Sequence, residues 1–203
     1  MSLEISHKTY IKTMSTLSEE IKKAREVIYQ GGVILYPTDT IWGIGCDATN
    51  EQAVAKVYAI KQRAESKALL CLVDSIQRLQ NYVQDFPDIA WDLIDCSDKP
   101  LTIIYEKGRN LANNLLGEDG SIGIRITKEA FSHGLCEAVR KPIVSTSANI
   151  AGAASPKCFA DIDPDIIAAV DYVVDYRREE KENPKASSII KLGTYGEINI
   201  IRP

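Results

Sequence analysis

Residues 31–49 read GGVILYPTDTIWGIGCDAT, and this stretch decides how the rest of the chain is interpreted. Its apolar run, Val33 to Tyr36, is typical of a buried strand. The run gives way to a proline, two threonines flanking an aspartate, and two glycines around an isoleucine. A plain connection needs turn residues, but not adjacent hydroxyl and carboxylate groups beside glycines that permit close backbone approach. The stretch therefore predicts a strand followed by a ligand-binding loop.

The sequence on both sides of this stretch predicts helices. Thr16-Leu17-Ser18-Glu19 has the pattern of a capping box, and the apolar residues after it share one face up to the glycines at 31 and 32. Thr49-Asn50-Glu51-Gln52 repeats the capping pattern, so we expect a second helix that runs to Lys61.

Strand and helix patterns are intermixed over the rest of the chain. We expect strands at about 68–73, 101–105, 122–126, 143–145, 172–174, 187–192 and 197–201. We expect one helix capped by Asp74, and others at about 87–95, 128–140 and 163–170. This order predicts a layered α/β or α+β domain with a mostly buried, mixed sheet.

The composition is that of an ordinary globular protein, with 45% hydrophobic and 26% charged residues in a chain of 203. No apolar run has membrane-spanning length, and the N-terminus lacks the apolar region of a signal peptide. Five scattered cysteines without a C-x-x-C pair indicate reduced thiols. We therefore expect a cytoplasmic protein with no membrane association.

Two further counts restrict the chemistry. With only two histidines, a multi-histidine metal centre is excluded. A net charge of -4 gives no global basic field, so nucleic-acid binding would need a local basic patch.

The glycines formally match a dinucleotide-binding pattern. Gly43 to Ala48 reads G-x-G-x-x-A, and Glu65 lies downstream where a ribose-binding acid would stand. In that fingerprint the glycines form the turn from strand to helix, whereas here they lie well past Pro37 and the helix starts near Asn50. The context disfavours a nicotinamide site.

A cluster of cations follows the second helix. Lys61, Arg63 and Lys67 surround one connection, and such a cluster suits a polyanion such as a triphosphate. Basic residues at the end of a helix also complement its dipole, which is the default interpretation of the cluster taken alone.

A second polar cluster ends the strand at 143–145. Its sequence, Ser145 to Asn149, reads STSAN and places short hydroxyl and amide groups where layered α/β sheets tend to bind ligands. A polar turn with capping roles is the alternative. Without a G-x-S-x-G elbow or a recognisable histidine partner, acyl-serine chemistry is disfavoured.

A third stretch, residues 175–185, is highly charged and predicts a solvated loop, with a lid over a site as the alternative.

Seven segments in order resemble the YrdC-like family of threonylcarbamoyl-AMP synthases. They are GGVILYPTDTIWGIGCDAT, KQR with Lys67, KPLTIIY, IGIRIT, KPIVSTSANIAG, SSII and INIIRP. The specific part is K-x-R followed far downstream by S-x-N. The resemblance implies a three-layer YrdC/RibB-like α/β (α+β) domain, with a twisted, mixed central sheet flanked by helices. We expect a single domain over residues 1–203, without the C-terminal extension of longer members.

The resemblance implies an L-threonylcarbamoyladenylate synthase, a nucleotidyltransferase. It would join L-threonine, bicarbonate and ATP into threonylcarbamoyl-AMP and pyrophosphate, for the threonylcarbamoyladenosine modification of tRNA. Mg²⁺ bound mainly through ATP is the expected cofactor, with no metal site made by protein ligands. Expected partners are the tRNA-modification proteins that use the product, together with weak tRNA or double-stranded RNA binding.

The resemblance also implies roles for particular residues. Threonine would be held by Tyr36, Thr38 and Thr40. ATP would be bound by Lys61, Arg63, Lys67, Arg125, Ser145, Ser147, Asn149, Ser187 and Arg202. Catalysis would rest on Lys61, Arg63, Ser147 and Asn149.

Two rival functions stay open at this point. A non-catalytic protein of the same fold that binds double-stranded RNA would need a basic cleft, which the net charge of -4 argues against without excluding it. A carbamoyl-transfer relative that uses carbamoyl phosphate ranks lower, because the chain carries both K-x-R and S-x-N together with the threonine-side hydroxyls.

Overall fold

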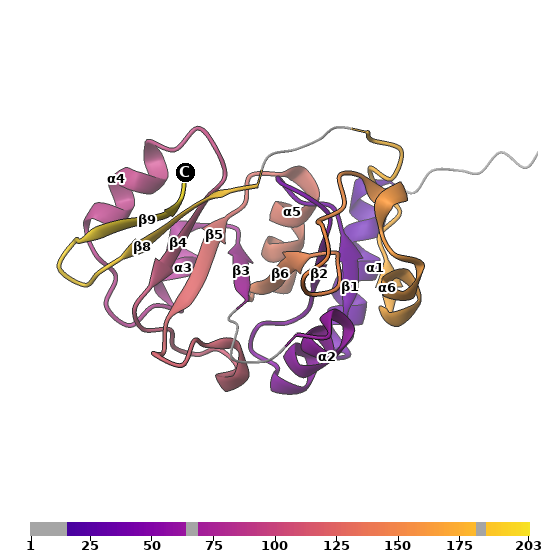
Figure 1. Ribbon diagram of the computed structural model, residues 1–203, viewed down its shortest axis with the longest axis horizontal. Coiled ribbons are helices and arrows are strands. Elements are labelled where there is room, and N and C mark those ends of the chain that lie inside the picture. The colour runs from indigo at the N-terminus through magenta and orange to yellow at the C-terminus, as the bar shows by residue number, and fades with distance from the viewer. Residues whose placement is uncertain (1–15, 64–68, 182–185) are drawn as a thin grey trace, which may run out of the picture.

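A computed structural model describes residues 16–63, 69–181 and 186–203 (Figure 1). The helices are α1 (Leu17–Tyr29), α2 (Glu51–Lys61), α3 (Ile76–Gln80), α4 (Ile89–Asp95), η1 (Asn113–Leu115), α5 (Ala130–Val139), η2 (Phe159–Asp161) and α6 (Pro164–Ala169). The strands are β1 (Ile34–Tyr36), β2 (Gly43–Gly45), β3 (Leu70–Val73), β4 (Leu101–Tyr105), β5 (Ile122–Ile126), β6 (Ile143–Ser147), β7 (Tyr172–Val173), β8 (Ser188–Leu192) and β9 (Ile198–Arg202).

Over these described residues the strands form one mixed sheet. Their order is β7-β1-β2-β6-β3-β5-β4-β8-β9. The pairs β1/β7, β3/β5 and β4/β8 are parallel, and the other neighbouring pairs are antiparallel. The predicted fold class, a mixed central sheet flanked by helices, is confirmed.

Both faces of the sheet are covered, which makes the fold three-layered. Successive side chains of a strand point to opposite faces, and Ile34 and Leu35 belong to different core clusters. The cluster that contains Ile34 lies under α1 and α5. The larger cluster that contains Leu35 brings in α2, α3, α4 and α6 from the other side.

Capping chemistry sets the starts of the helices, although two caps differ from the prediction. The capping box of Thr16 and Glu19 is present at α1, as predicted. The cap of α2 is Asn50 rather than Thr49, because the Asn50 side chain accepts hydrogen bonds from two backbone amides. The cap of α3 is Ser75 rather than Asp74. The carboxylate of Asp74 instead pairs with Arg78.

The glycine pair belongs to a strand that the sequence analysis assigned to the loop. Strand β2 pairs with both β1 and β6. A Cβ atom on Gly45 would overlap the carbonyl oxygen of Val144 and the ring of Tyr36. Gly45 is therefore required by packing inside the sheet. Alternation of polar and apolar residues could not reveal so short a strand, because glycine carries no side chain.

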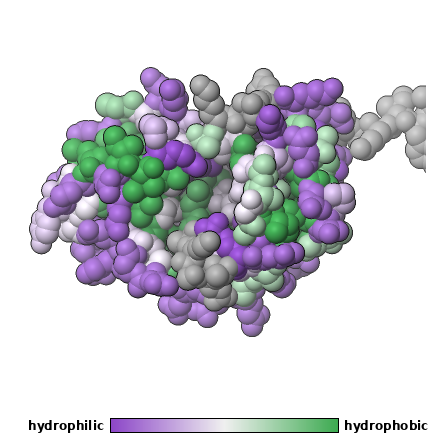
Figure 2. Space-filling model, in the orientation of Figure 1, coloured by the Kyte–Doolittle hydropathy of each residue, from purple (hydrophilic) through white to green (hydrophobic). Residues whose placement is uncertain are grey.

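One edge of the sheet is unusually apolar. The side chains of Ile198, Ile200 and Ile201 in β9 are exposed, and they form part of the hydrophobic surface beside β8 and α4 in Figure 2. No helix among the described residues is long and apolar enough to cross a membrane.

Candidate functional site

A cavity of about 450 Å³ opens on the sheet face that also carries α1 and α5. The hollow is visible between the two halves of the molecule in Figure 2. Its polar lining residues are Thr40, Arg63, Thr102, Ser121, Arg125, Ser145, Thr146, Ser147, Ser155, Ser187 and Arg202. Its apolar lining residues and glycines are Ile41, Gly43, Leu69, Leu70, Ile104, Gly123, Ala186 and Ile189.

Strand alternation explains why polar side chains reach this cavity. In β5, Ile122 and Ile124 enter the larger core cluster, whereas Gly123 and Arg125 face the cavity. The same alternation in β4 sends Thr102 to the cavity. The side chains that face away from the cavity thus stabilise the sheet, while those that face it are available for a ligand.

Arg125 is the most deeply buried cation of the cavity, with a side chain only 3% exposed. Its Nη2 lies 2.8 Å from Oδ1 of Asp39 and donates at 3.4 Å to the hydroxyl of Thr40. Burial raises the pKa of Asp39, and the positive charge of Arg125 opposes that rise. The Nε atom of Arg125 is buried without a hydrogen-bond partner among the described residues. An unsatisfied buried donor of this kind suits an anionic ligand.

Hydroxyl groups and a second arginine surround Arg125. The hydroxyl of Thr102 accepts from Arg125 at 3.4 Å and lies 2.9 Å from the hydroxyl of Ser187. Arg202 donates through Nε to the carbonyl of Ser187 at 2.8 Å and through Nη2 to its hydroxyl at 3.3 Å. Strands β4, β5 and β9 thus bring together groups that are far apart in the sequence.

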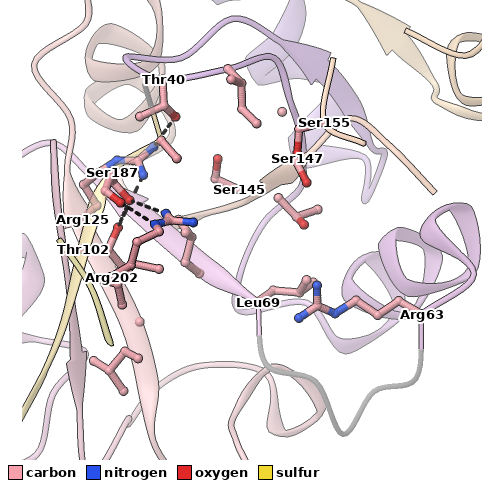
Figure 3. Close-up of a pocket in the computed structure, with 18 of the residues that line it drawn as sticks. Thr40, Arg63, Leu69, Thr102, Arg125, Ser145, Ser147, Ser155, Ser187 and Arg202 are labelled. Carbon is pink, nitrogen blue, oxygen red and sulfur yellow. Dashed lines mark hydrogen bonds between the residues drawn. The ribbon is translucent and has the colours of Figure 1, made fainter. Parts of the chain in front are cut away.

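Arg63 lies on the other side of the cavity. It follows the last residue of α2, and Figure 3 shows its guanidinium reaching in beside Leu69, across from the group formed by Arg125 and Arg202. Positive charge therefore borders the cavity from two sides, and an extended polyanion can be neutralised at both ends.

Lys61 is placed differently from its predicted position around the phosphates. Its side chain is buried, and Nζ donates to the backbone carbonyls of Ser147 at 2.5 Å and Asn149 at 2.7 Å. Lys61 is not among the residues that line the cavity. Burial, with a smaller contribution from the charge of Arg63, lowers the pKa of Lys61 to about 8. The ammonium group therefore fastens the STSAN segment to the end of α2.

Only some residues of the STSAN segment line the cavity. Ser145, Thr146 and Ser147 line the cavity, whereas Asn149 is not among its lining residues. The amide nitrogen of Asn149 donates to the carbonyls of Ile150 and Ala153, and its Oδ1 is buried without a partner among the described residues. That oxygen is a second unsatisfied buried group, two residues after Ser147 of the cavity lining.

Only one of the three residues predicted to bind threonine lines the cavity. Thr40 lines the cavity. The hydroxyl of Thr38 donates to the carbonyl of Ile41 at 2.7 Å and accepts from the amide of Thr40 at 3.0 Å, so it organises the loop. Tyr36 is fully buried, its hydroxyl donates to the carbonyl of Val144, and burial raises its pKa. Its side chain lies in the core rather than in the cavity lining.

The structure also adds residues that the sequence analysis missed. Thr102 and Asp39 join the site through Arg125, and Ser121 and Ser155 complete its polar lining. Asp39 stood between the two predicted threonines, so its position was a usable signal. Thr102 belongs to the segment KPLTIIY, but nothing in that segment assigned it to the site, because it meets Arg125 only through the pairing of β4 with β5. Lys67 lies outside the described residues.

The described residues contain no cluster of three or more His, Cys, Asp or Glu side chains that could hold a metal ion. The carboxylate of Asp39, which contacts Arg125 of the cavity lining, is already engaged by that guanidinium.

Comparison with known proteins identifies relatives that cover most of the chain. The family model Sua5/YciO/YrdC, described as "Telomere recombination", matches residues 26–203. The chain is 34% identical over 158 residues to a protein named threonylcarbamoyl-AMP synthase of Pseudoalteromonas translucida, covering 76% of this chain and 84% of that protein. It is 33% identical over 159 residues to a protein of the same name from Xanthomonas euvesicatoria, covering 77% and 85%.

Solved structures share the fold at lower identity. A structure of P. abyssi Sua5 complexed with L-threonine has a TM-score of 0.80 and 24% identity, covering 93% of this chain and 54% of that one. The chain thus spans about half of that longer protein. The structure of E. coli YciO has a TM-score of 0.76 at 24% identity, covering 90% and 87%.

Proposed function

Because the chain belongs to the Sua5/YciO/YrdC family, whose model matches residues 26–203, we propose that it is an L-threonylcarbamoyladenylate synthase. It would form threonylcarbamoyl-AMP and pyrophosphate from L-threonine, bicarbonate and ATP. The relatives named threonylcarbamoyl-AMP synthase support this reaction, and the L-threonine complex of P. abyssi Sua5 supports the amino-acid substrate. The reaction transfers an adenylyl group, so the enzyme would be a nucleotidyltransferase.

One observation of the site carries the proposal. The cavity joins arginines on two sides with hydroxyl groups from strands β4 and β6 and from the connecting segments, and the described residues place no histidine in its lining. Such a lining neutralises and positions anions, but offers no ordinary general base. Adenylyl transfer to a carbamate needs that combination, because positioning and charge stabilisation dominate phosphoryl chemistry.

The chemistry would proceed in two steps. Bicarbonate loses hydroxide to give carbon dioxide, and the amine nitrogen of threonine adds to the carbon of this carbon dioxide. The proton lost from the amine combines with the hydroxide, so a carbamate and water form. A carbamate oxygen then attacks the α-phosphorus of ATP, the bond to the bridging oxygen of the β-phosphate breaks, and pyrophosphate leaves. Negative charge is present throughout, so fixed guanidinium groups lower the barrier without transferring a proton.

The residues would divide this work by position. Arg63 would neutralise the phosphates on one side, and Arg125 and Arg202 would hold anionic groups on the other. Ser145 and Ser147 would donate hydrogen bonds between the two sides. Lys61 would hold the segment that carries these serines, through the carbonyl of Ser147.

A magnesium ion is part of the proposal as a cofactor carried by ATP. Mg²⁺ needs few protein ligands when the triphosphate supplies oxygens, so the ion would be held mainly by ATP. The ion would neutralise the triphosphate when it is bound.

The family relationship favours the synthase over the RNA-binding alternative, because the two curated relatives described above carry the synthase name. We propose that the product feeds tRNA-modification proteins and that any direct tRNA binding is weak. We place the activity in the cytoplasm, because all five cysteines are free thiols.

The test is pyrophosphate release by the purified chain with ATP, Mg²⁺, threonine and bicarbonate, each omitted in turn. We expect release only in the complete mixture, together with a product that has the mass of threonylcarbamoyl-AMP. Valine and alanine should support far less release, because a site that pairs with a substrate hydroxyl rejects analogues without it. A folded protein that releases no pyrophosphate in the complete mixture would refute the assignment.

A further inference from the structure

The charged stretch after β7 is fastened to the molecule over its described part. Residues 174–181 are called the strap here. The strap begins where the amide of Val174 donates to the carbonyl of Leu35 and the amide of Asp175 donates to the buried carboxylate of Glu20. Its first half is partly buried, which differs from the solvated loop that the charge pattern predicted.

Two aromatic contacts hold the middle of the strap. The ring of Tyr176 stacks on Phe131 of α5 at 6.2 Å between centroids. The guanidinium of Arg178 lies 5.0 Å above the ring of Phe159, which packs against Trp42 at 4.9 Å. The strap is therefore held on both sides of Arg177.

Arg177 connects the strap to the loop that carries Thr38 and Thr40. Its Nη1 donates to the backbone carbonyl of Thr38 at 3.3 Å and lies 3.2 Å from the carboxylate of Glu129. Its Nε donates to Glu180 at 2.7 Å. Glu129 is itself fixed, because it caps the N-terminus of α5. One guanidinium thus joins the loop, the helix and the strap.

The backbone of Arg177 supports a specific role for this side chain. Its φ angle is +60°, in the left-handed region that glycine adopts readily and other residues adopt at a cost. An arginine at this position accepts that cost while its side chain forms contacts that glycine cannot make.

Within the loop, hydrogen bonds link Thr38 to Thr40, which lines the cavity. The Thr38 hydroxyl accepts from the amide of Thr40 at 3.0 Å and lies 3.1 Å from the Thr40 hydroxyl. Thr40 lines the cavity beside Arg125, and it also borders a separate small hollow together with Thr38 and Arg177. A shift of Thr38 would therefore move a hydroxyl group of the site.

We propose that Arg177 is a positioning residue for the threonine substrate: it holds the carbonyl of Thr38 and thereby fixes the hydroxyl of Thr40 in the cavity. This role rests on the proposed synthase function. It assigns Arg177 to the affinity for threonine rather than to the affinity for ATP, because its contacts with Thr38, Glu129 and Glu180 include none of the residues assigned to ATP.

The test compares two variants with a matched control. Arg177→Gly removes the guanidinium and relieves the positive φ angle, whereas Arg177→Gln removes the guanidinium and keeps that backbone cost. Arg109→Gln is the control, because Arg109 also donates to backbone carbonyls, those of Gln80 and Asn81, but outside the cavity lining. We expect both Arg177 variants to raise KM for threonine about tenfold. KM for ATP and kcat should change less than twofold, and the control should match the parent.

A second measurement does not depend on activity. Amide hydrogen exchange of Thr40 without substrates should be faster in both Arg177 variants than in the parent and in Arg109→Gln. Unchanged exchange in both variants would overturn the positioning role, and so would equal losses of affinity for threonine and ATP. If the parent released no pyrophosphate, the synthase assignment would fail, and the exchange measurement would still decide whether Arg177 fixes the loop.

Discussion

The two halves of one sheet face are built alike and used differently. Leu72 of β3 and Arg125 of β5 are register partners in neighbouring parallel strands. Leu72 is covered in the core cluster of α1 and α5, whereas Arg125 faces the cavity. The covered half stabilises the fold through apolar contacts, while the other half leaves polar groups for a ligand. The area of the sheet face that α1 and α5 cover therefore decides which side chains remain available to a ligand.

The largest effect on stability is expected in the covered half. Leu135 of α5 is fully buried in the cluster with Leu72, so Leu135→Ala should lower the free energy of unfolding by about 2–5 kcal/mol. Ile189→Ala, on the half-buried wall of the cavity, should cost clearly less, because fewer contacts are lost. Denaturant titration of both variants measures the difference. Equal costs would mean that the two halves do not differ in packing.

The open half should show the reverse pattern, with loss of activity and little loss of stability. Arg63→Ala removes positive charge from one side of the cavity, and we expect pyrophosphate release to fall by about 10²-fold or more. The unfolding midpoint should stay near that of the parent, because Arg63 is not part of either core cluster. Full activity in this variant would contradict the phosphate-binding assignment.

Lys61 is buried like a residue of the covered half but charged like a residue of the open half. Its contribution to the free energy of unfolding should therefore depend on pH. Its pKa is about 8 in the folded protein against 10.5 for the unperturbed group, so the unfolded state binds more protons between these values. The cost of burying its charge is complete below pH 8 and is relieved as pH rises toward 10.5. Relative to Lys61→Met, the parent should therefore gain about 1–3 kcal/mol of stability across this window. Parallel stability curves for the two proteins would refute the lowered pKa.

RNA binding is expected to give the smallest effect. The only polyanion site that we assign is the cavity, so duplex RNA should bind at near-physiological salt no more tightly than about 10⁻⁶ M, and ATP should weaken it further. A titration of labelled duplex RNA with and without ATP measures both. Tight binding indifferent to ATP would indicate a separate RNA surface.

Much of the site was predictable from the sequence because its motifs report residue types. The arginines at 63, 125 and 202 and the serines at 145, 147 and 187 were predicted around ATP, and the structure brings all of them to one cavity. The family resemblance, inferred from the same motifs, is confirmed by the match over residues 26–203. The roles assigned to these residues stay predictions.

The sequence by itself determined the described strands other than β2, the amphipathic helices and the polar segments at the strand ends, because these depend on local alternation, periodicity and turn chemistry. Only the tertiary structure decided which polar groups meet. Thr102 reaches Arg125 through strand pairing, Lys61 turns to the carbonyl groups of Ser147 and Asn149, and Arg177 reaches Thr38 across the fold. These contacts join residues far apart in the chain, and a local pattern carries no information about which distant group a flexible, charged side chain will find.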